Sequence, residues 1–249
     1  PVGYDNYDVG YLNQKKIWLA NTPHVLTETT ADLAFTLLLS AARKVPFLDH
    51  WTKQGEWKRT VGPQQFGLDV FGKTLGIIGL GNIGAAIARR GFYGFNMNIV
   101  YHNRREKPEL AEPLKAQYLG LEELLQQSDF VVTAVDLNAE SKALMGKAQF
   151  ELMQKHAIFI NIARGSVVDE QALIEALQNE VIFAAGLDVY EKEPLQESAL
   201  FTLPNVVTLP HVGSATAETR KKMANLAYKN LVEALEDKTP RYLVNPNFV

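Results

Sequence analysis

Four residues in the second half of the chain have side chains that suit acid–base chemistry and anion binding. Each comes shortly after an apolar run that predicts a buried strand, and they are Arg164, Asp188, Glu193 and His211. Ligands of parallel sheets bind outside the carboxyl ends of the strands, so we expect these side chains around one crevice. One guanidinium, two carboxylates and one imidazole in such a crevice suit the reduction of a keto acid.

Each of these residue types has a definite use in that reaction. Arg164 can hold a substrate carboxylate by two parallel hydrogen bonds and polarise the adjacent carbonyl group. His211 can donate the proton that the carbonyl oxygen takes up as a hydride arrives, and a carboxylate such as Glu193 favours the protonated imidazole. Taken singly, each residue is more often structural or on the surface. Their shared place at strand ends, beside a nucleotide-binding turn, favours a catalytic site.

A glycine-rich turn provides a site for the cofactor of such a reduction. An apolar run at 75–78 leads into GLGNIG at 79–84, and a helix is predicted over 85–93. Gly79 permits the tight turn, Gly81 lets the backbone approach a pyrophosphate, and Gly84 lets the helix pack closely, while amides at the helix start attract the anion. Asn82 and Ile83 belong to the same predicted cofactor site. A ligand-free turn is the less favoured alternative, because the flanking strand and helix are those that the motif needs.

The residues that follow the next strand, at 98–101, indicate which dinucleotide binds. An NAD-preferring unit has an acidic residue about 20 positions beyond the turn, but this sequence continues HNRR from residue 102. Arg104 and Arg105 would attract the 2′-phosphate of NADPH through charge-assisted hydrogen bonds. We therefore predict that Asn103, Arg104 and Arg105 bind the cofactor and that NADPH is preferred over NADH. The alternative is that both arginines are solvated surface charges.

Composition excludes several classes of function. The 249 residues include 25 basic and 28 acidic side chains, for a net charge of −3, without a long run of like charges, which argues against nucleic-acid binding. We found no apolar stretch of membrane-spanning length and no signal-peptide pattern, and we predict a cytoplasmic protein without membrane partners. The chain has no cysteine, and its five histidines lack metal-ligand spacing, so no metal is implied.

Apolar runs and helical segments alternate through the rest of the chain, which predicts an α/β fold with a doubly wound parallel sheet of the Rossmann type. Further strands are predicted at 130–133, 157–161, 184–187 and 206–209. Further helices are predicted at 121–127, 147–153, 170–178 and 215–236. Asp169 is expected to cap the helix at 170–178.

Several motifs together resemble the D-isomer-specific 2-hydroxyacid dehydrogenases, most closely the glyoxylate/hydroxypyruvate reductases and 2-ketogluconate reductases of that family. They are GLGNIG (79–84), NIARGSVVDEQAL (161–173), AGLDVYEKEP (185–194) and LPHVGSAT (209–216). The resemblance implies that Arg164 binds the substrate carboxylate, that Glu193 and His211 form the acid–base pair, and that Asp188 lies near the nicotinamide carboxamide.

The resemblance also implies further contacts. Ile162 and Gly213 would contact the cofactor and Ser214 would face the substrate, and the amides of Val2 and Gly3 in the opening VGYDN would bind the substrate carboxylate. Asp136 departs from the pattern of the family, which usually has proline or another uncharged residue there. A carboxylate at that place puts the neighbouring phosphate or ribose contacts in doubt.

The resemblance predicts three parts: residues 1–25 as a remnant of a flavodoxin-like substrate domain, 26–214 as the dinucleotide-binding domain, and 215–249 as a C-terminal helix and tail that return to the substrate domain. Members of the family have a longer first lobe, so we expect the chain to be a fragment or a truncated form. A lobe supplied by a partner is the less favoured alternative. A helix is predicted over 27–45 that is apolar on nearly every face, and the following segment has Phe47, Trp51, Trp57 and Phe66 among charged residues. This pattern fits either burial within the domain or, as the resemblance implies, a homodimer built on the helix and that segment.

Three hypotheses about function follow. The first is an NADPH-dependent reductase of 2-keto acids, with glyoxylate, hydroxypyruvate and 2-ketogluconate all open as substrates. The second is a dinucleotide-sensing co-regulator similar to the C-terminal binding proteins. The third is a nucleotide-binding chain without turnover. The combination of Arg164, Glu193 and His211 favours the first.

Overall fold

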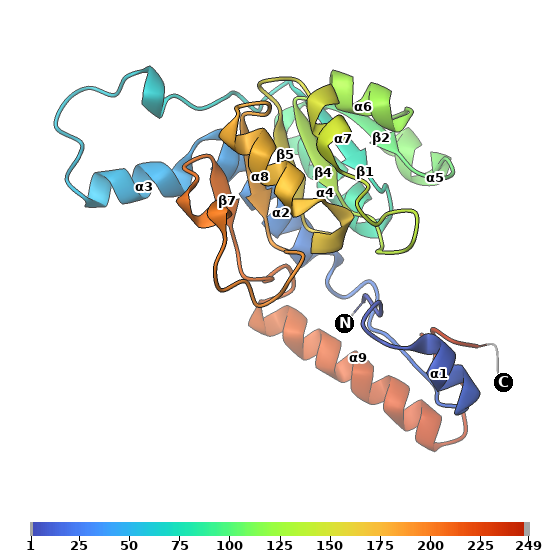
Figure 1. Ribbon diagram of the computed structural model, residues 1–249. Coiled ribbons are helices and arrows are strands. Elements are labelled where there is room, and N and C mark those ends of the chain that lie inside the picture. Colours follow the sequence, from blue (N-terminus) through green and yellow to red (C-terminus); the bar gives the residue numbers. More distant parts are fainter. Residues whose placement is uncertain (1, 247–249) are drawn as a thin grey trace. The chain divides into compact units, whose positions relative to one another are not determined.

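The computed structural model describes residues 2–246 and contains two compact units (Figure 1). The larger unit covers residues 31–213, and the smaller one combines the chain up to Thr30 with the chain from Ser214 onward. The domain limits predicted from the sequence, at residues 26 and 214, stay predictions.

A parallel sheet of seven strands, in the order β3-β2-β1-β4-β5-β6-β7, forms the centre of the larger unit. Its strands are β1 (Thr74–Ile78), β2 (Asn98–His102), β3 (Gln117–Tyr118), β4 (Phe130–Thr133), β5 (Ile158–Asn161), β6 (Ala184–Leu187) and β7 (Val206–Thr208). Successive strands are added on one side of β1 as far as β3, and on its other side from β4 onward. This order has its switch point between β1 and β4, and it confirms the predicted doubly wound fold.

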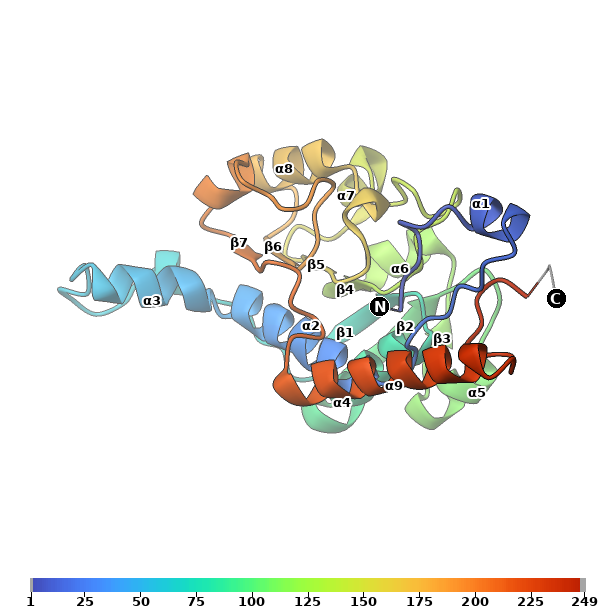
Figure 2. The same ribbon diagram turned by 90° about the horizontal axis from the view of Figure 1, so that it is seen from below.

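Helices cover both faces of this sheet, and the chain contains α1 (Val9–Gln14), α2 (Thr27–Ala42), α3 (Val45–Lys53), α4 (Asn82–Phe95), α5 (Pro108–Ala111), α6 (Leu121–Gln127), α7 (Lys147–Leu152), α8 (Glu170–Gln178) and α9 (Ala217–Leu235). Figure 2 shows α7 and α8 on one face and α2 and α4 on the other. Two separate apolar cores, one on each face, bury the side chains of the central strands. Burial on both faces explains why these strands are continuous apolar runs without alternation.

Two helix boundaries differ by three residues from the sequence prediction. The helix predicted over 27–45 ends at Ala42, because Lys44 has a left-handed conformation (φ 53°) and α3 starts afresh with Pro46 in its first turn. The helix predicted to begin at residue 85 begins at Asn82, inside the glycine motif. The first turn of α4 therefore supplies backbone amides to the glycine-rich motif.

The apolar character of α2 is explained within the larger unit. Ala34, Leu37, Leu38 and Ala41 lie on one side of the helix at helical spacing and are at most 3% exposed, in the core between α2, α4 and the sheet. Intradomain burial, one of the two alternatives for this segment, therefore accounts for these residues. By contrast, α3 and the segment after it extend away from the sheet (Figures 1 and 2), and Trp57 is 64% exposed there.

Asparagine side chains organise the smaller unit. Asn245 accepts a hydrogen bond from the amide of Leu19 (2.8 Å), and Asn230 on α9 donates to the carbonyl of Asn21 (2.9 Å). Asn21 in turn donates to the carbonyl of Val2 (2.9 Å), which fixes the start of the chain. Within residues 2–246 no helix is both long and apolar enough to cross a membrane.

Candidate active site

The imidazole of His211 is paired with the carboxylate of Glu193. Nδ1 of His211 lies 2.7 Å from Oε2 of Glu193, and the two side chains are 47% and 33% exposed. Oε1 of Glu193 accepts a hydrogen bond from the amide of Tyr190 (3.0 Å), so both carboxylate oxygens are used. His211 itself has a left-handed backbone (φ 54°), a conformation that is uncommon outside glycine and recurs at functional sites. The two residues predicted to form the acid–base pair are therefore in direct contact, and their role in catalysis stays a prediction.

The loop that carries His211 is fixed from both sides by residues after β6. The two carboxylate oxygens of Asp188 accept hydrogen bonds from the amides of Val212 and Gly213, each at 2.8 Å. Burial raises the pKa of Asp188 above its ordinary value near 3.8, although these two amides act in the opposite direction. Asp188 is 2% exposed, and its observed contacts hold the backbone that follows His211.

Tyr190 holds the other side of the same loop. Its hydroxyl group donates to the carbonyl of Leu209 (2.9 Å), two residues before His211. Burial raises the pKa of Tyr190 to about 12, so the hydroxyl keeps its proton at any physiological pH. The backbone on both sides of His211 is thus held by hydrogen bonds, which restricts where the imidazole can lie.

Arg164 lies in a turn that packs directly on the loop before Glu193. The buried side chain of Asn161 shapes this turn, since it accepts from the amide of Ala163 (3.0 Å) and donates to the carbonyl of Arg164 (3.0 Å). A Cβ atom added at Gly165 would overlap the backbone of Tyr190, so only glycine permits this contact. The structure thereby brings the half-buried Arg164 into the neighbourhood of the pair formed by Glu193 and His211.

The glycine-rich turn has the properties that a pyrophosphate needs. Gly79 has φ +102°, and an added Cβ there would lie 2.6 Å from the carbonyl oxygen of Ala134, while one at Gly84 would collide with the carbonyl of Gly79. At Gly81 an added Cβ would meet nothing within 4 Å, so the space above that residue is open. Gly81 is also the N-cap of α4 and provides no side-chain cap for the first turn. An open cradle beside an uncapped helix start fits the pyrophosphate of a dinucleotide.

The predicted cofactor residues after β2 have different roles in the structure. The side chain of Asn103 accepts a hydrogen bond from the amide of Leu80 (2.7 Å), so it ties the end of β2 to the glycine-rich turn. Arg104 forms an ion pair with Glu140 (3.0 Å) from the loop after β4, and Arg105 is exposed. Asn103 thus holds the glycine-rich turn in place. Direct contact of Asn103 with the cofactor, and of both arginines with its 2′-phosphate, stays a prediction.

The other predicted contacts are distributed between the two units. Ile162 is 8% exposed and Gly213 is buried, both within the larger unit. Val2, Gly3 and Ser214 belong to the smaller unit, and their contact with substrate stays a prediction. Asp136, the departure from the family pattern, is exposed, and its backbone carbonyl accepts a hydrogen bond from the hydroxyl group of Ser141 (2.6 Å).

Sequence reasoning missed the residues that support the site. Gly165, Tyr190 and Asn161 lie inside the motifs already quoted, but their roles depend on contacts between strands that are distant along the chain. The one hint in the sequence was the glycine directly after Arg164, which suggests a close backbone contact at that point. Nothing in the sequence around Glu140 indicated its ion pair, because its partner Arg104 lies 36 positions earlier.

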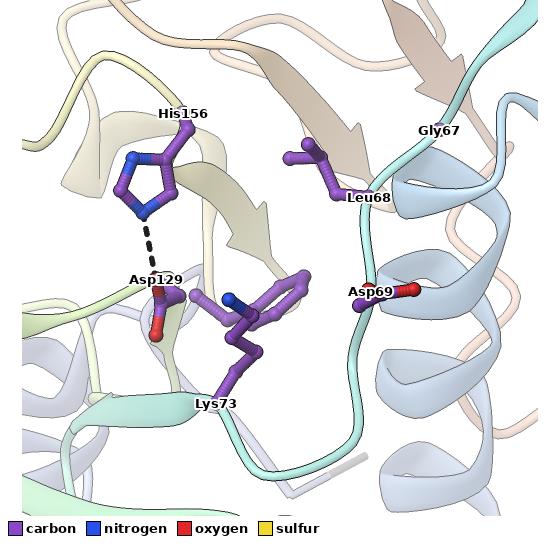
Figure 3. A pocket seen from close by; sticks show the side chains of 7 residues that line it. Gly67, Leu68, Asp69, Lys73, Asp129 and His156 are labelled. Carbon is purple, nitrogen blue, oxygen red and sulfur yellow. Dashed lines mark hydrogen bonds and ion pairs between the residues drawn. The ribbon is translucent and has the colours of Figure 1, made fainter.

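A pocket of about 230 Å³ lies at the opposite edge of the sheet, where the strands begin (Figure 3). Asp129, just before β4, binds Nε2 of His156 (2.7 Å) and the amide of Thr74 (2.8 Å). None of the residues predicted for the active site lines this pocket. In the part of the chain that the structure describes, no group of three or more His, Asp and Glu side chains could hold a metal ion.

A doubly wound sheet, an open glycine-rich cradle and a histidine–carboxylate pair at the carboxyl ends of the strands define a dinucleotide-dependent oxidoreductase. Comparison with known proteins agrees with this class. The family model for the NAD-binding domain of D-isomer-specific 2-hydroxyacid dehydrogenases matches residues 35–213. The chain belongs to this family.

Individual relatives are similar over almost the whole chain. A glyoxylate/hydroxypyruvate reductase B from Enterobacter sp. (strain 638) is 54% identical over 247 residues, which are 99% of this chain and 76% of the relative. Among solved structures, the TT0316 protein from Thermus thermophilus has a TM-score of 0.90 at 42% identity, with coverage of 98% of this chain and 76% of that protein. An NADPH-dependent glyoxylate/hydroxypyruvate reductase from Sinorhizobium meliloti, in complex with NADP and malonate, has a TM-score of 0.88 at 38% identity, over 98% of this chain and 75% of that protein.

Proposed function

We propose that this protein reduces small 2-keto acids to D-2-hydroxy acids, with glyoxylate and hydroxypyruvate as its main substrates and 2-ketogluconate as a further one. The observation that carries the proposal is the contact between His211 and Glu193 (2.7 Å), next to the turn that bears Arg164. The similarity to reductases named for glyoxylate and hydroxypyruvate supports the substrate class. It also favours an enzyme over the co-regulator and over a chain without turnover.

The residues of the site divide the work of the reaction. Arg164 binds the substrate carboxylate and orients the neighbouring carbonyl group. In this proposal Nδ1–H of the protonated His211 donates a hydrogen bond to Glu193. Nε2–H then donates to the substrate carbonyl oxygen and transfers its proton to that oxygen as the alcohol forms. Asp188 and Tyr190 keep the backbone around His211 in place. A reduced nicotinamide dinucleotide, when bound in the cradle, supplies the hydride.

We further propose that NADPH is preferred over NADH. Arg104 and Arg105 lie at the end of β2, where the acidic residue of an NAD-preferring unit would be. A guanidinium attracts the 2′-phosphate of NADPH and gains little from the 2′-hydroxyl of NADH. The NADP complex of the Sinorhizobium meliloti relative supports this preference.

The proposal includes a cytoplasmic homodimer. The support for the dimer is α3 and the segment after it, which extend from the sheet and expose Trp57 (64%) and Phe66 (58%). Large aromatic side chains exposed along one segment would be covered in such a dimer. Sedimentation analysis tests this part, since a monomer at micromolar concentration contradicts it.

Steady-state kinetics with the protein at its natural length test the proposed reaction. Each of the three keto acids is offered with NADPH and with NADH, and the consumption of the reduced nicotinamide is followed by absorbance. Arg164→Gln should lower kcat/KM by about 10²-fold or more, because it removes charge-assisted hydrogen bonds of about 1.5–3 kcal/mol each. Arg43→Gln removes the same charge at an exposed place in the larger unit and serves as the control. Absence of turnover with all three acids refutes the proposed function.

A further inference from the structure

An ion pair crosses the end of the strand that leads into the glycine-rich turn. Strand β1 lies between β2 and β4 and pairs with both in parallel. Arg104 follows β2 and Glu140 lies in the loop after β4, and Nη1 of Arg104 is 3.0 Å from Oε2 of Glu140. The pair therefore spans the carboxyl end of β1, which is the side of the sheet where a dinucleotide lies in this fold.

The backbone that carries Arg104 is held at two points. Asn103 accepts a hydrogen bond from the amide of Leu80 in the glycine-rich turn (2.7 Å). The hydroxyl group of Tyr118, on the edge strand β3, donates to the carbonyl of Asn103 (2.9 Å). The position of Cα of Arg104 is thus defined relative to the cradle, and the long side chain alone can change its partner.

The loop that carries Glu140 is also ordered by its own hydrogen bonds. Oδ1 of Asn138 accepts from the amides of Glu140 (2.9 Å) and Ser141 (3.1 Å), and the hydroxyl group of Ser141 donates to the carbonyl of Asp136 (2.6 Å). These hydrogen bonds fix the backbone of the loop from which Glu140 reaches Arg104. Two backbones held by hydrogen bonds thus carry one exposed pair of opposite charges.

The pair is of the kind that another anion can replace. The side chains of Arg104 and Glu140 are 76% and 68% exposed, so water weakens their attraction. A phosphate monoester carries roughly 1.5–2 negative charges near neutral pH and offers three strong acceptor oxygens, against one charge on a carboxylate. A 2′-phosphate within reach of Arg104 would therefore displace Glu140 and be repelled by the carboxylate that it displaces.

We propose that Glu140 is a specificity-determining residue, which competes with the 2′-phosphate of NADPH for Arg104 and so reduces the preference for NADPH over NADH. This inference rests on the proposed use of Arg104 in the cofactor site. A 2′-hydroxyl group has no charge to compete for the guanidinium, so the pair with Glu140 persists when NADH binds. Glu140 therefore weakens the binding of NADPH and leaves the binding of NADH unchanged.

Calorimetric titration of the protein at its natural length tests the inference without any catalysis. The probes are 2′,5′-ADP and 5′-ADP, which differ in the phosphate of interest, and the variants are Glu140→Gln, Arg104→Gln and the two combined. Glu122→Gln, an exposed glutamate on α6 with the same loss of charge, is the matched control. At low salt, where screening is weak, Glu140→Gln should tighten 2′,5′-ADP about three- to tenfold and change 5′-ADP by less than about twofold.

The combined variant separates competition from a general effect of charge. With Arg104→Gln in place, adding Glu140→Gln should change the affinity for 2′,5′-ADP by less than about twofold, because the group competed for is gone. Unchanged or weaker binding of 2′,5′-ADP by Glu140→Gln overturns the inference, as does equal tightening of both probes. The same keto acid assays separate the two proposals: a wild-type protein without turnover that shows the expected binding pattern refutes the proposed reaction and keeps the role of Glu140.

Discussion

Replacing Glu193 by glutamine tests the hydrogen bonding around His211 directly. In the structure one carboxylate oxygen of Glu193 accepts from the amide of Tyr190 (3.0 Å) and the other contacts Nδ1 of His211 (2.7 Å). Glutamine has one acceptor oxygen and one NH₂ group, so it cannot accept from both neighbours. If the oxygen keeps the amide of Tyr190, the NH₂ group faces Nδ1 and favours the neutral imidazole.

The neutral imidazole with hydrogen on Nε2 is a poor proton donor, because giving up that proton would leave an anionic ring. Positioned general acids contribute about 10²- to 10⁴-fold to rates. We therefore expect Glu193→Gln to lower kcat about 10²- to 10³-fold, which is about 3–4 kcal/mol in activation free energy. The affinity for the dinucleotide should change by less than about twofold, since the cradle at Gly81 is built from other residues.

The assay is the reduction of glyoxylate and hydroxypyruvate, with kcat and dinucleotide affinity measured separately. Glu191→Gln is the matched control, because Glu191 is exposed, carries the same charge and lies two residues away in the same loop. A Glu193→Gln protein with kcat within about threefold of wild type refutes the assignment of Glu193 as the partner of the proton donor.

Three further predictions concern the residues that support the site. Gly165→Ala should lower the free energy of unfolding by about 1–3 kcal/mol, because the added methyl group meets the backbone of Tyr190. The control Gly94→Ala, in open space on α4, should be neutral or stabilising. Denaturant unfolding measures both variants, and equal effects contradict the packing argument. Tyr190→Phe should lower the free energy of unfolding by about 0.5–1.5 kcal/mol, because the hydrogen bond to Leu209 is lost. The loss should be the same at pH 7 and at a pH of about 9, since the pKa of Tyr190 of about 12 keeps the hydroxyl group protonated. A loss that becomes smaller over that range argues against this role of the hydroxyl group. Burial raises the pKa of Asp188. The stabilisation linked to this shift is present below the ordinary pKa near 3.8 and is lost as the pH rises through the pKa of the folded protein. Asp188→Asn should remove that part of the pH dependence of the free energy of unfolding, and parallel curves for the two proteins would show that Asp188 does not titrate in this way.

Several elements were predictable from the sequence because they are determined locally. The strands β4 and β6 are short apolar runs with turn residues on both sides, and their predicted bounds equal the observed ones. Asp169 was predicted to cap α8, and its carboxylate accepts from the amide of Ala172 (3.1 Å). The GLGNIG turn was equally predictable, since a left-handed Gly79 and a close approach at Gly84 are requirements of glycine itself.

Other elements depended on neighbours that are distant along the chain. Strand β3 has two exposed residues and no apolar pattern, so it exists because the edge of β2 is there to pair with. The end of α2 at Ala42 follows from the left-handed Lys44, which the helical pattern of the segment does not show.

Sequence reasoning was enough to choose the chemical groups that we assign to the site and to place them at the carboxyl ends of the strands. Residue types and the period of the apolar runs are enough for that, because carboxyl ends of parallel strands converge on one edge. The partner of His211 was also expected before the structure, and the fold supplied the contact itself, between residues 18 positions apart. The pair of Arg104 and Glu140 came only from the fold. It joins loops 36 positions apart, and hydrogen-bond geometry over such a separation depends on the packing of the whole sheet.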